Sequence, residues 1–374
     1  SMKKLIFRNI FKDITYFFLI TSISLTLIVW VIQAVNYLDF VSEDGHSFQV
    51  YFMYSLLSLP KIFSKLILFV FFISVFFTIS RYEENNEILI FWTHGIKKSE
   101  FINKLILFSF LYFLLNIALS IFIVPKTQDL AKSYIRDSNI DYFPSLIKTE
   151  HFNDAANELT IFVEKKDNNG LIKNIFIKEN VQENKSQIIS AKEGFLAKKN
   201  NSFYLILYNG NIVNIDSKNT NIIKFEKSEF NLSKFGSKST IFPKIQETES
   251  IKLYECLNSF IKYKIRYEDG KFRCNESSIN DVFKELYKRL ILPFYIILSA
   301  FVAGCLVINS KTQMNFSRFK IFIFSIGFLF ILFSEGSSNF LSLFDLYKSI
   351  VVLVPFILIT VIYFIFINSK KVRS

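Results

Sequence analysis

The pattern of apolar and polar positions divides the chain into three parts. An apolar N-terminal part and an apolar C-terminal part flank a polar stretch that runs from about Lys126 to Lys288. Each apolar part contains three runs of about the length that a helix needs to cross ~30 Å of hydrocarbon at ~1.5 Å per residue. The runs are Ile14–Tyr37, Pro60–Ser80, Phe101–Val124, Leu290–Ile308, Phe319–Phe333 and Ile350–Ile367. We therefore expect a helical membrane protein with six transmembrane helices.

The polar stretch has the composition of β-strands. Its runs are rich in β-branched and aromatic residues, and Asp167–Gly170, Lys199–Ser202 and Asn209–Gly210 separate them as turn signals. No helical segment long enough for a crossover interrupts the runs, which argues against a parallel sheet. We expect an antiparallel, jelly-roll-like all-β domain between the third and fourth spans. The expected strands are Leu159–Lys166, Leu171–Lys178, Gln187–Ala197, Phe203–Asp216 and Asn221–Phe230.

These elements predict three domains. Residues 1–125 hold the first three spans, residues 126–288 hold the β domain and a return segment, and residues 289–374 hold the last three spans. The return segment, from Glu247 to Leu290, is expected to be mostly helical or irregular. Cys256 and Cys274 lie in it, and both a disulfide and two free thiols fit the sequence.

The composition supports a chain with two kinds of environment. A hydrophobic content of 51%, an aromatic content of 17% and a mean hydropathy of +0.33 are unusual for a soluble chain of 374 residues, yet 20% of the residues are charged. The first apolar run is too long for a signal peptide and is followed by no small-residue cleavage site. We expect the first helix to be retained.

The charges that flank the spans predict an orientation. Connections rich in Lys and Arg stay in the cytoplasm. Basic residues precede the first span and follow the second, fourth and sixth, and all four positions fall on one side of a six-span chain. The connections on the other side carry acidic residues, among them Asp39, Glu43, Glu335 and Asp345. Both termini are therefore expected in the cytoplasm, and the β domain in the periplasm.

The sequence offers little catalytic chemistry. His46, His94 and His151 are scattered over different predicted loops, which argues against a metal site. The loop Gly236–Thr240 lacks the residue order of a nucleotide-binding loop, and no catalytic serine, carboxylate pair or zinc motif is present. We therefore expect neither an enzyme nor a bound cofactor in this chain.

The net charge of +12 does not require a nucleic-acid partner. Much of the excess lies in the basic flanks of the spans, and the remainder is spread over the β domain. There, both a solvated sheet face and a surface beside an anionic glycolipid fit the sequence. No nucleic acid is expected as a partner.

The connection between the second and third spans, Arg81–Glu100, is the sharpest functional candidate. Acidic residues precede a short apolar stretch, and basic residues follow it, as suits a short helix. One interpretation is an amphipathic turn at the membrane interface. The other is a coupling helix, at about residues 83–96, whose apolar side chains fill a groove in a cytoplasmic motor. The candidate coupling residues are Glu83, Glu84, Glu87, Ile88, Phe91, Trp92 and Gly95.

A family resemblance favours the coupling helix. Three spans, a β domain, three further spans and the segment Arg81–Lys98 resemble the lipopolysaccharide export permeases, the LptF/LptG family. In that family an acidic pair, an apolar stretch and a small residue plus Gly form the coupling helix. Glu87 aligns with the last acidic residue, and Asn85 or Glu84 takes the place of its partner. The first span and the opening hairpin of the β domain favour the LptF branch, while the segment Tyr54–Pro60 would also suit LptG.

The resemblance implies the permease subunit of an ABC transporter in the bacterial inner membrane. Such a subunit forms a heterodimer with an LptG-like permease, and an LptB-like ATPase dimer, which binds ATP and Mg²⁺, drives it. It extracts lipopolysaccharide from the membrane and passes it to an LptC-like periplasmic acceptor.

Candidates for the lipid path lie on the first and fifth spans. Headgroups would enter at the outer end of the first span, and acyl chains would meet aromatic residues on one face of the fifth, although packing against lipid is the simpler interpretation of the aromatic face. The candidates are Gln33, Asn36, Tyr37, Phe40, Phe322, Phe330 and Phe333.

Two other classes stay open. A permease of the FtsX/MacB type also combines an extracytoplasmic domain with an ATPase, but it has four spans. A membrane-anchored sensor or assembly protein would use its β domain to bind a partner without transport, and it would need no contact with an ATPase.

Overall fold

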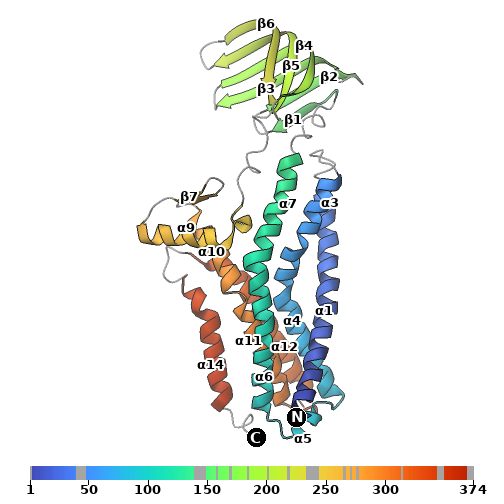
Figure 1. Ribbon diagram of the computed structural model, residues 1–374, viewed down its shortest axis with the longest axis vertical. Coiled ribbons are helices and arrows are strands. Elements are labelled where there is room, and N and C mark those ends of the chain that lie inside the picture. Colours follow the sequence, from blue (N-terminus) through green and yellow to red (C-terminus); the bar gives the residue numbers. More distant parts are fainter. Residues whose placement is uncertain are drawn as a thin grey trace. The chain divides into compact units, whose positions relative to one another are not determined.

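The computed structural model describes most of the chain in two compact units (Figure 1). The first comprises Ser1–Ile32, Leu57–Asp129 and Pro243–Ser374, and the second comprises Gln33–Leu56 and Leu130–Phe242. The described residues are 2–38, 48–138, 149–156, 159–167, 171–182, 185–199, 202–216, 220–232, 244–263, 267–269, 272–274, 278–312, 315–342 and 349–368.

Helices dominate both ends of the chain. The N-terminal elements are α1 (Met2–Tyr37), α3 (Phe48–Leu57), α4 (Leu59–Glu84), α5 (Leu89–Thr93), α6 (Lys98–Ala118), the π-helical η1 (Leu119–Ile123) and α7 (Val124–Ser138). The C-terminal helices are η4 (Ile245–Glu247), α9 (Ser250–Tyr263), α10 (Ile279–Leu290), α11 (Phe294–Gly304), η5 (Cys305–Ile308), α12 (Phe316–Phe340), η6 (Ile350–Leu353) and α14 (Val354–Asn368). In the first unit α1 begins, α5 lies and α14 ends at the same end of the bundle (Figure 1).

Four helices of the described chain are long and apolar enough to cross a membrane. They are Met2–Tyr37, Phe48–Glu84, Lys98–Ile135 and Phe316–Phe340. A fifth crossing is possible for the pair Ile279–Leu290 and Phe294–Ile308, which is bent by 44°, and the apolar helix Ile350–Phe364 is shorter. The predicted helical membrane protein is thus confirmed with four to five spans.

The third predicted span does not end at Val124. A π-helical turn, η1, follows α6, and the helix continues as α7 through Pro125 to Ser138. Proline lacks an N–H and its ring crowds the preceding turn, and a π-turn is one way to widen a helix locally. The expected boundary of the β domain at residue 126 therefore lies inside a helix.

The core of the first unit is formed by α4, α6 and α11, with α1 and α12 packed around them. Aromatic rings fill much of it: Phe71 and Phe72 are fully buried, and Phe71 contacts the ring of Tyr112 at 4.5 Å. Gly327 of α12 faces the ring of Phe72 so closely that an added Cβ would overlap it. This glycine sets how near α12 approaches α4.

The return segment is more ordered than expected. Besides its helices it contains a hairpin of β7 (Tyr267–Asp269) and β8 (Phe272–Cys274), and a disulfide joins Cys256 of α9 to Cys274. The buried guanidinium of Arg289 donates to the carbonyl oxygen of Thr248 at 2.9 Å and pairs with Glu285 at 2.9 Å. These contacts, with a bond from Arg289 to the Ser250 hydroxyl at 2.8 Å, fix the start of α9 to the end of α10, next to the bend of the helix pair.

The β domain is one antiparallel sheet of six strands. They pair in sequence order, as an up-and-down meander among the described residues, and a jelly-roll topology is not confirmed. The first strand, β1, was not expected from the sequence. The strands are β1 (Phe152–Ala156), β2 (Leu159–Lys166), β3 (Leu171–Gln182), β4 (Lys185–Lys199), β5 (Ser202–Asp216) and β6 (Thr220–Asn231).

A line of irregular positions crosses this sheet. Glu164, Asn174, Lys192, Asn209 and Glu226 occupy one cross-strand column, and each adjacent pairing skips it. On one side of the column the buried or partly buried residues are odd-numbered in β3 and β4 and even-numbered in β5, and on the other side the parity is reversed in each of these strands. Because neighbouring strands change phase at the same column, their pairing register is the same on both sides of it, although the buried residues change from odd to even or the reverse. A single sheet therefore folds along the line and encloses a core.

The expected turn at Asn209–Gly210 is wrong, because both residues lie inside β5. Asn209 has a positive φ of 50°, which asparagine tolerates, and it belongs to the irregular column. At Gly210 a Cβ would overlap the carbonyl oxygen of Ser190 and the ring of Phe225. The Asn-Gly pair therefore marks a close approach between strands instead of a hairpin.

Gly210→Ala is expected to destabilise the β domain. The added methyl must displace backbone of β4, which is a case of overpacking that costs about 1–3 kcal/mol. Hydrogen exchange should show faster amide exchange in β4, β5 and β6 and unchanged exchange in α4 and α6. Unchanged protection of the three strands would contradict this account of the glycine.

Candidate functional site

The segment between α4 and α6 is a compact turn built around the short helix α5. Two residues with left-handed backbone bracket it, Asn86 at φ 60° and Gly95 at φ 70°. Asparagine and glycine adopt this conformation at least cost. The N–H of Ile88 donates to the carbonyl oxygen of Tyr82 at 3.1 Å, which folds the segment back against the end of α4.

The inner face of α5 packs against its own chain. Ile88 and Phe91 are each 1% exposed, and the ring of Phe91 lies edge-on to Phe7 of α1 at 5.6 Å and to Phe101 of α6 at 5.2 Å. Trp92 is half-buried beside Phe101. These contacts contradict the expectation that Ile88 and Phe91 fill a groove in another protein, because both side chains already lie in the core.

The outer face of α5 is apolar and exposed. Leu89 is 49% exposed and Ile90 is 47% exposed, and Thr93 lies beside them in the same exposed strip. The His94 ring closes the C-terminal end of the helix, with Nδ1 2.7 Å from the carbonyl oxygen of Ile90. The spacing in the sequence did not identify Leu89 and Ile90 as the exposed residues. In a helix of five residues, both faces show three- and four-residue spacing, so the spacing does not tell the buried face from the exposed one.

Two of the predicted carboxylates, Glu83 and Glu84, hold the segment to α12 and to the connection between η5 and α12. Glu83 is buried and its Oε1 accepts from the backbone N–H of Lys311 at 2.7 Å. The Lys311 ammonium donates to the carbonyl oxygen of Glu84 at 2.7 Å, and Lys320 of α12 donates to Oε1 of Glu84 at 2.5 Å. Glu83 and Glu84 thus make internal contacts. From the sequence, their basic partners were predictable only as charges near the end of a span.

Glu87 lies at the entry to α5. Its side chain is half-buried, and its Oε1 accepts from the amide of Asn85 at 3.0 Å. This local bond holds the carboxylate against the turn that enters α5.

Contacts with the rest of the bundle fix the segment further. The Lys3 ammonium of α1 donates to the carbonyl oxygen of Gly95 at 3.1 Å and lies 3.6 Å from the carboxylate of Glu100. Lys98 donates to the carbonyl oxygen of Ile308 at 2.9 Å. The α5 segment is therefore bonded to α1 and packed on α1 and α6, and α6 is itself bonded to the end of η5, so a displacement of α5 must move or strain α1 and α6.

The residues predicted for the lipid path are distributed over both units. Gln33, Asn36 and Tyr37 lie in the second unit at the end of α1, where Asn36 is exposed and the Tyr37 ring lies edge-on to Tyr54 at 4.9 Å. Phe40 lies outside the described residues.

The three phenylalanines of α12 that were predicted for the lipid path belong to the first unit. Phe322 is 59% exposed and Phe333 is 44% exposed, whereas Phe330 packs partly against the core. An exposed aromatic face on an apolar helix fits lipid contact, as the sequence predicted, and it assigns no transport role by itself.

Comparisons with known proteins agree with this architecture. The chain is 24% identical over 193 residues to an "Uncharacterized protein RP871" of Rickettsia prowazekii (strain Madrid E), an alignment that covers 51% of this chain and 53% of that protein. The chain thus spans about half the length of this curated relative. The family model described as "Lipopolysaccharide export system permease LptF/LptG" matches residues 8–369, nearly the whole chain. The chain therefore belongs to the LptF/LptG family of lipopolysaccharide export permeases.

Proposed function

We propose that this chain is one permease subunit of an ABC transporter that extracts lipopolysaccharide from the inner membrane. A separate cytoplasmic ATPase dimer of the LptB type binds ATP and Mg²⁺ and supplies the work. The chain itself carries no catalytic residue and no cofactor in this proposal. An LptG-like permease completes the membrane part, with this chain as the LptF-like half, and an LptC-like acceptor receives the lipid.

The observation that carries the proposal is the α5 segment. An exposed strip of Leu89, Ile90 and Thr93 stands on a turn that is bonded to α1 and packed on α1 and α6. An apolar helix face that its own chain leaves open suits a groove in a partner. Since the inner face is packed on Phe7 and Phe101, a push on the outer face reaches the transmembrane helices through buried contacts.

The proposal includes six spans, with η6 and α14 as the sixth. With this topology both termini and α5 lie in the cytoplasm, and the β domain lies in the periplasm. The apolar face of the folded sheet supplies a jelly-roll-like surface along which acyl chains pass to the acceptor. The outer end of α1, with Gln33, Asn36, Tyr37 and Phe40, meets the sugar headgroup, and Phe322, Phe330 and Phe333 meet acyl chains.

Site-specific photocrosslinking tests the ATPase contact. A photoreactive phenylalanine analogue at Leu89 or Ile90 is expected to crosslink the full-length chain to an ATPase subunit in membranes of its host. The same analogue at Ile88 or Phe91 is expected to give no such product, because those side chains lie in the core. Immunoblotting and mass spectrometry of the crosslinked band identify the partner.

The control is the analogue at Phe322, an exposed residue of α12 that is expected to face lipid. ATPase crosslinks from Phe322 as strong as those from Leu89 would show that the product reports proximity in the membrane and not docking at α5. Absence of any ATPase product from Leu89 and Ile90, with the chain inserted and intact, would refute the proposed contact and favour a sensor or assembly protein.

A further inference from the structure

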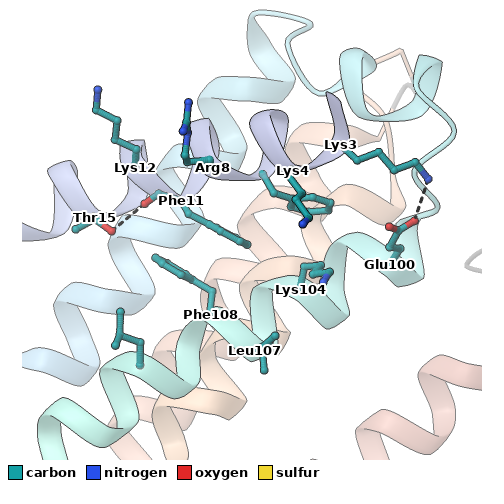
Figure 2. A pocket seen from close by; sticks show the side chains of 12 residues that line it. Lys3, Lys4, Arg8, Phe11, Lys12, Thr15, Glu100, Lys104, Leu107 and Phe108 are labelled. Carbon is teal, nitrogen blue, oxygen red and sulfur yellow. Dashed lines mark hydrogen bonds and ion pairs between the residues drawn. The ribbon is translucent and has the colours of Figure 1, made fainter. Parts of the chain in front are cut away.

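A groove of about 830 Å³ runs between the N-terminal half of α1 and the start of α6 (Figure 2). Both helices belong to the first unit. The groove has an apolar floor and a basic rim, and neither the coupling role of α5 nor the proposed lipid path uses it. It is lined by Lys3, Lys4, Phe7, Arg8, Phe11, Lys12, Thr15, Glu100, Lys104, Leu107, Phe108 and Leu111.

The rim carries more positive charge than its own chain neutralises. Lys4, Arg8 and Lys12 recur every four residues of α1, over about 12 Å, and Lys104 of α6 also lines the groove. In Figure 2 Arg8 and Lys12 extend from α1 in one direction, and Lys4 extends toward α6. Glu100, the acidic residue among the described lining residues, is paired with Lys3. Among the described residues no hydrogen bond or ion pair joins the other four cations to a partner.

The floor is suited to hydrocarbon. The rings of Phe11 and Phe108 are stacked at 4.3 Å with an interplanar angle of 4°, and they join α1 to α6 beneath the cations. Leu107 and Leu111 extend the apolar lining along α6, and they are 66% and 63% exposed. A ligand that fits this lining has an anionic head and an apolar tail.

A second protein helix is a poor occupant. Packed helix pairs in membranes use small residues that let backbones approach closely, whereas this groove is lined by Phe, Leu, Lys and Arg. Burial of four cations against an apolar helix would also leave charges without partners, which is costly in a membrane. A phosphate removes this cost, because it accepts charge-assisted hydrogen bonds from Arg and Lys.

We propose that the α1–α6 groove binds an acidic phospholipid, with the phosphate on Arg8 and its neighbouring lysines and an acyl chain on the Phe11–Phe108 floor. Basic pockets between transmembrane helices bind anionic headgroups in this way on the cytoplasmic side of membranes. The bound lipid belongs to the cytoplasmic leaflet, given the orientation in the proposed function, and it is a resident lipid distinct from the exported one. It also stiffens the contact of α1 with α6, the helices on which the α5 segment is packed.

Native mass spectrometry of the purified full-length chain in detergent tests this site. Dioleoyl phosphatidylglycerol is titrated against the chain, with dioleoyl phosphatidylcholine as the neutral lipid of equal tail length. We expect the first bound phosphatidylglycerol to be held at least tenfold more tightly than phosphatidylcholine. The triple variant Lys4→Gln, Arg8→Gln, Lys12→Gln is expected to lose at least tenfold of the phosphatidylglycerol affinity.

The matched control removes three exposed cations from the sheet, with Lys178→Gln, Lys192→Gln and Lys224→Gln, and it should bind phosphatidylglycerol as the native chain does. Equal losses in both triple variants, or none in the groove variant, would overturn the assignment. Equal affinity for the two phospholipids would overturn its charge selectivity. Tighter binding of lipid A than of phosphatidylglycerol, lost with the same groove substitutions, would assign the groove to the exported lipid instead. A thermal transition like that of the native chain verifies that the variants are folded.

Discussion

Replacement of both Leu89 and Ile90 by Glu is expected to lower the affinity of this permease for its ATPase at least 100-fold. The two side chains are about half exposed on the outer face of α5 and form the apolar strip offered to the partner. The substitution removes two apolar contacts and places two carboxylates in a desolvated groove. The binding free energy that is lost therefore exceeds the ~2.7 kcal/mol that corresponds to a 100-fold change in affinity. Quantitative pull-down of the ATPase with detergent-solubilised chain measures the loss.

Three further variants distinguish docking from folding. Leu89→Met with Ile90→Val keeps an apolar strip and should retain the ATPase. Ile222→Glu with Ile223→Glu places the same charges on two adjacent, exposed residues of β6 and should also retain it. Phe91→Ala, on the inner face, should instead lower the thermal stability, since truncation of a buried Phe costs about 3–5 kcal/mol. Normal ATPase recovery by the double Glu variant would remove the outer face of α5 from the coupling role.

Gly327→Val is expected to separate α12 from α4. A Cβ at this position overlaps the ring of Phe72, which is fully buried and packed between Phe76 and Phe324. The ring has no open space to enter, so the helices must shift. Overpacking of this kind costs about 1–3 kcal/mol and occasionally more, which exceeds any gain in helix propensity from the loss of glycine. Thermal unfolding in detergent should show a lower transition temperature.

Gly336→Val in the same helix is the matched control, because a Cβ there meets nothing within 4 Å. It should leave the transition temperature nearly unchanged. Phe72→Ala should partly rescue Gly327→Val, with the double variant more stable than the sum of the two single losses predicts. Equal destabilisation by valine at both glycines, or additive losses in the double variant, would contradict a specific Gly327–Phe72 contact.

Much of the fold was readable from the sequence because long apolar runs and alternating strands have few competing structures. The strand Leu159–Lys166 was predicted with the bounds that it has, and four further strands differed by a few residues at their ends. Asn209–Gly210 was misread because a local turn signal cannot show that a neighbouring strand needs the space of a side chain. The continuation of α6 through Pro125 was missed because a π-turn absorbs the usual effect of proline.

The sequence singled out the α5 segment as a candidate site, but it did not predict which face of α5 is buried in its own chain. Acidic residues before an apolar stretch identified the segment, whereas the direction of each side chain depends on tertiary contacts with Phe7 and Phe101. Likewise, Lys311 and Lys320 were seen as orientation signals, and only the fold brings them to Glu83 and Glu84. Charges far apart in sequence carry no information about their pairing.

Co-purification from the native host tests the central claim most directly. Tagged full-length chain is extracted in mild detergent, and mass spectrometry identifies every protein and lipid that accompanies it. The account predicts an LptB-like ATPase and a second permease of the same family, together with lipopolysaccharide. Recovery of the intact chain with neither protein would contradict the exporter role and favour a sensor or assembly protein.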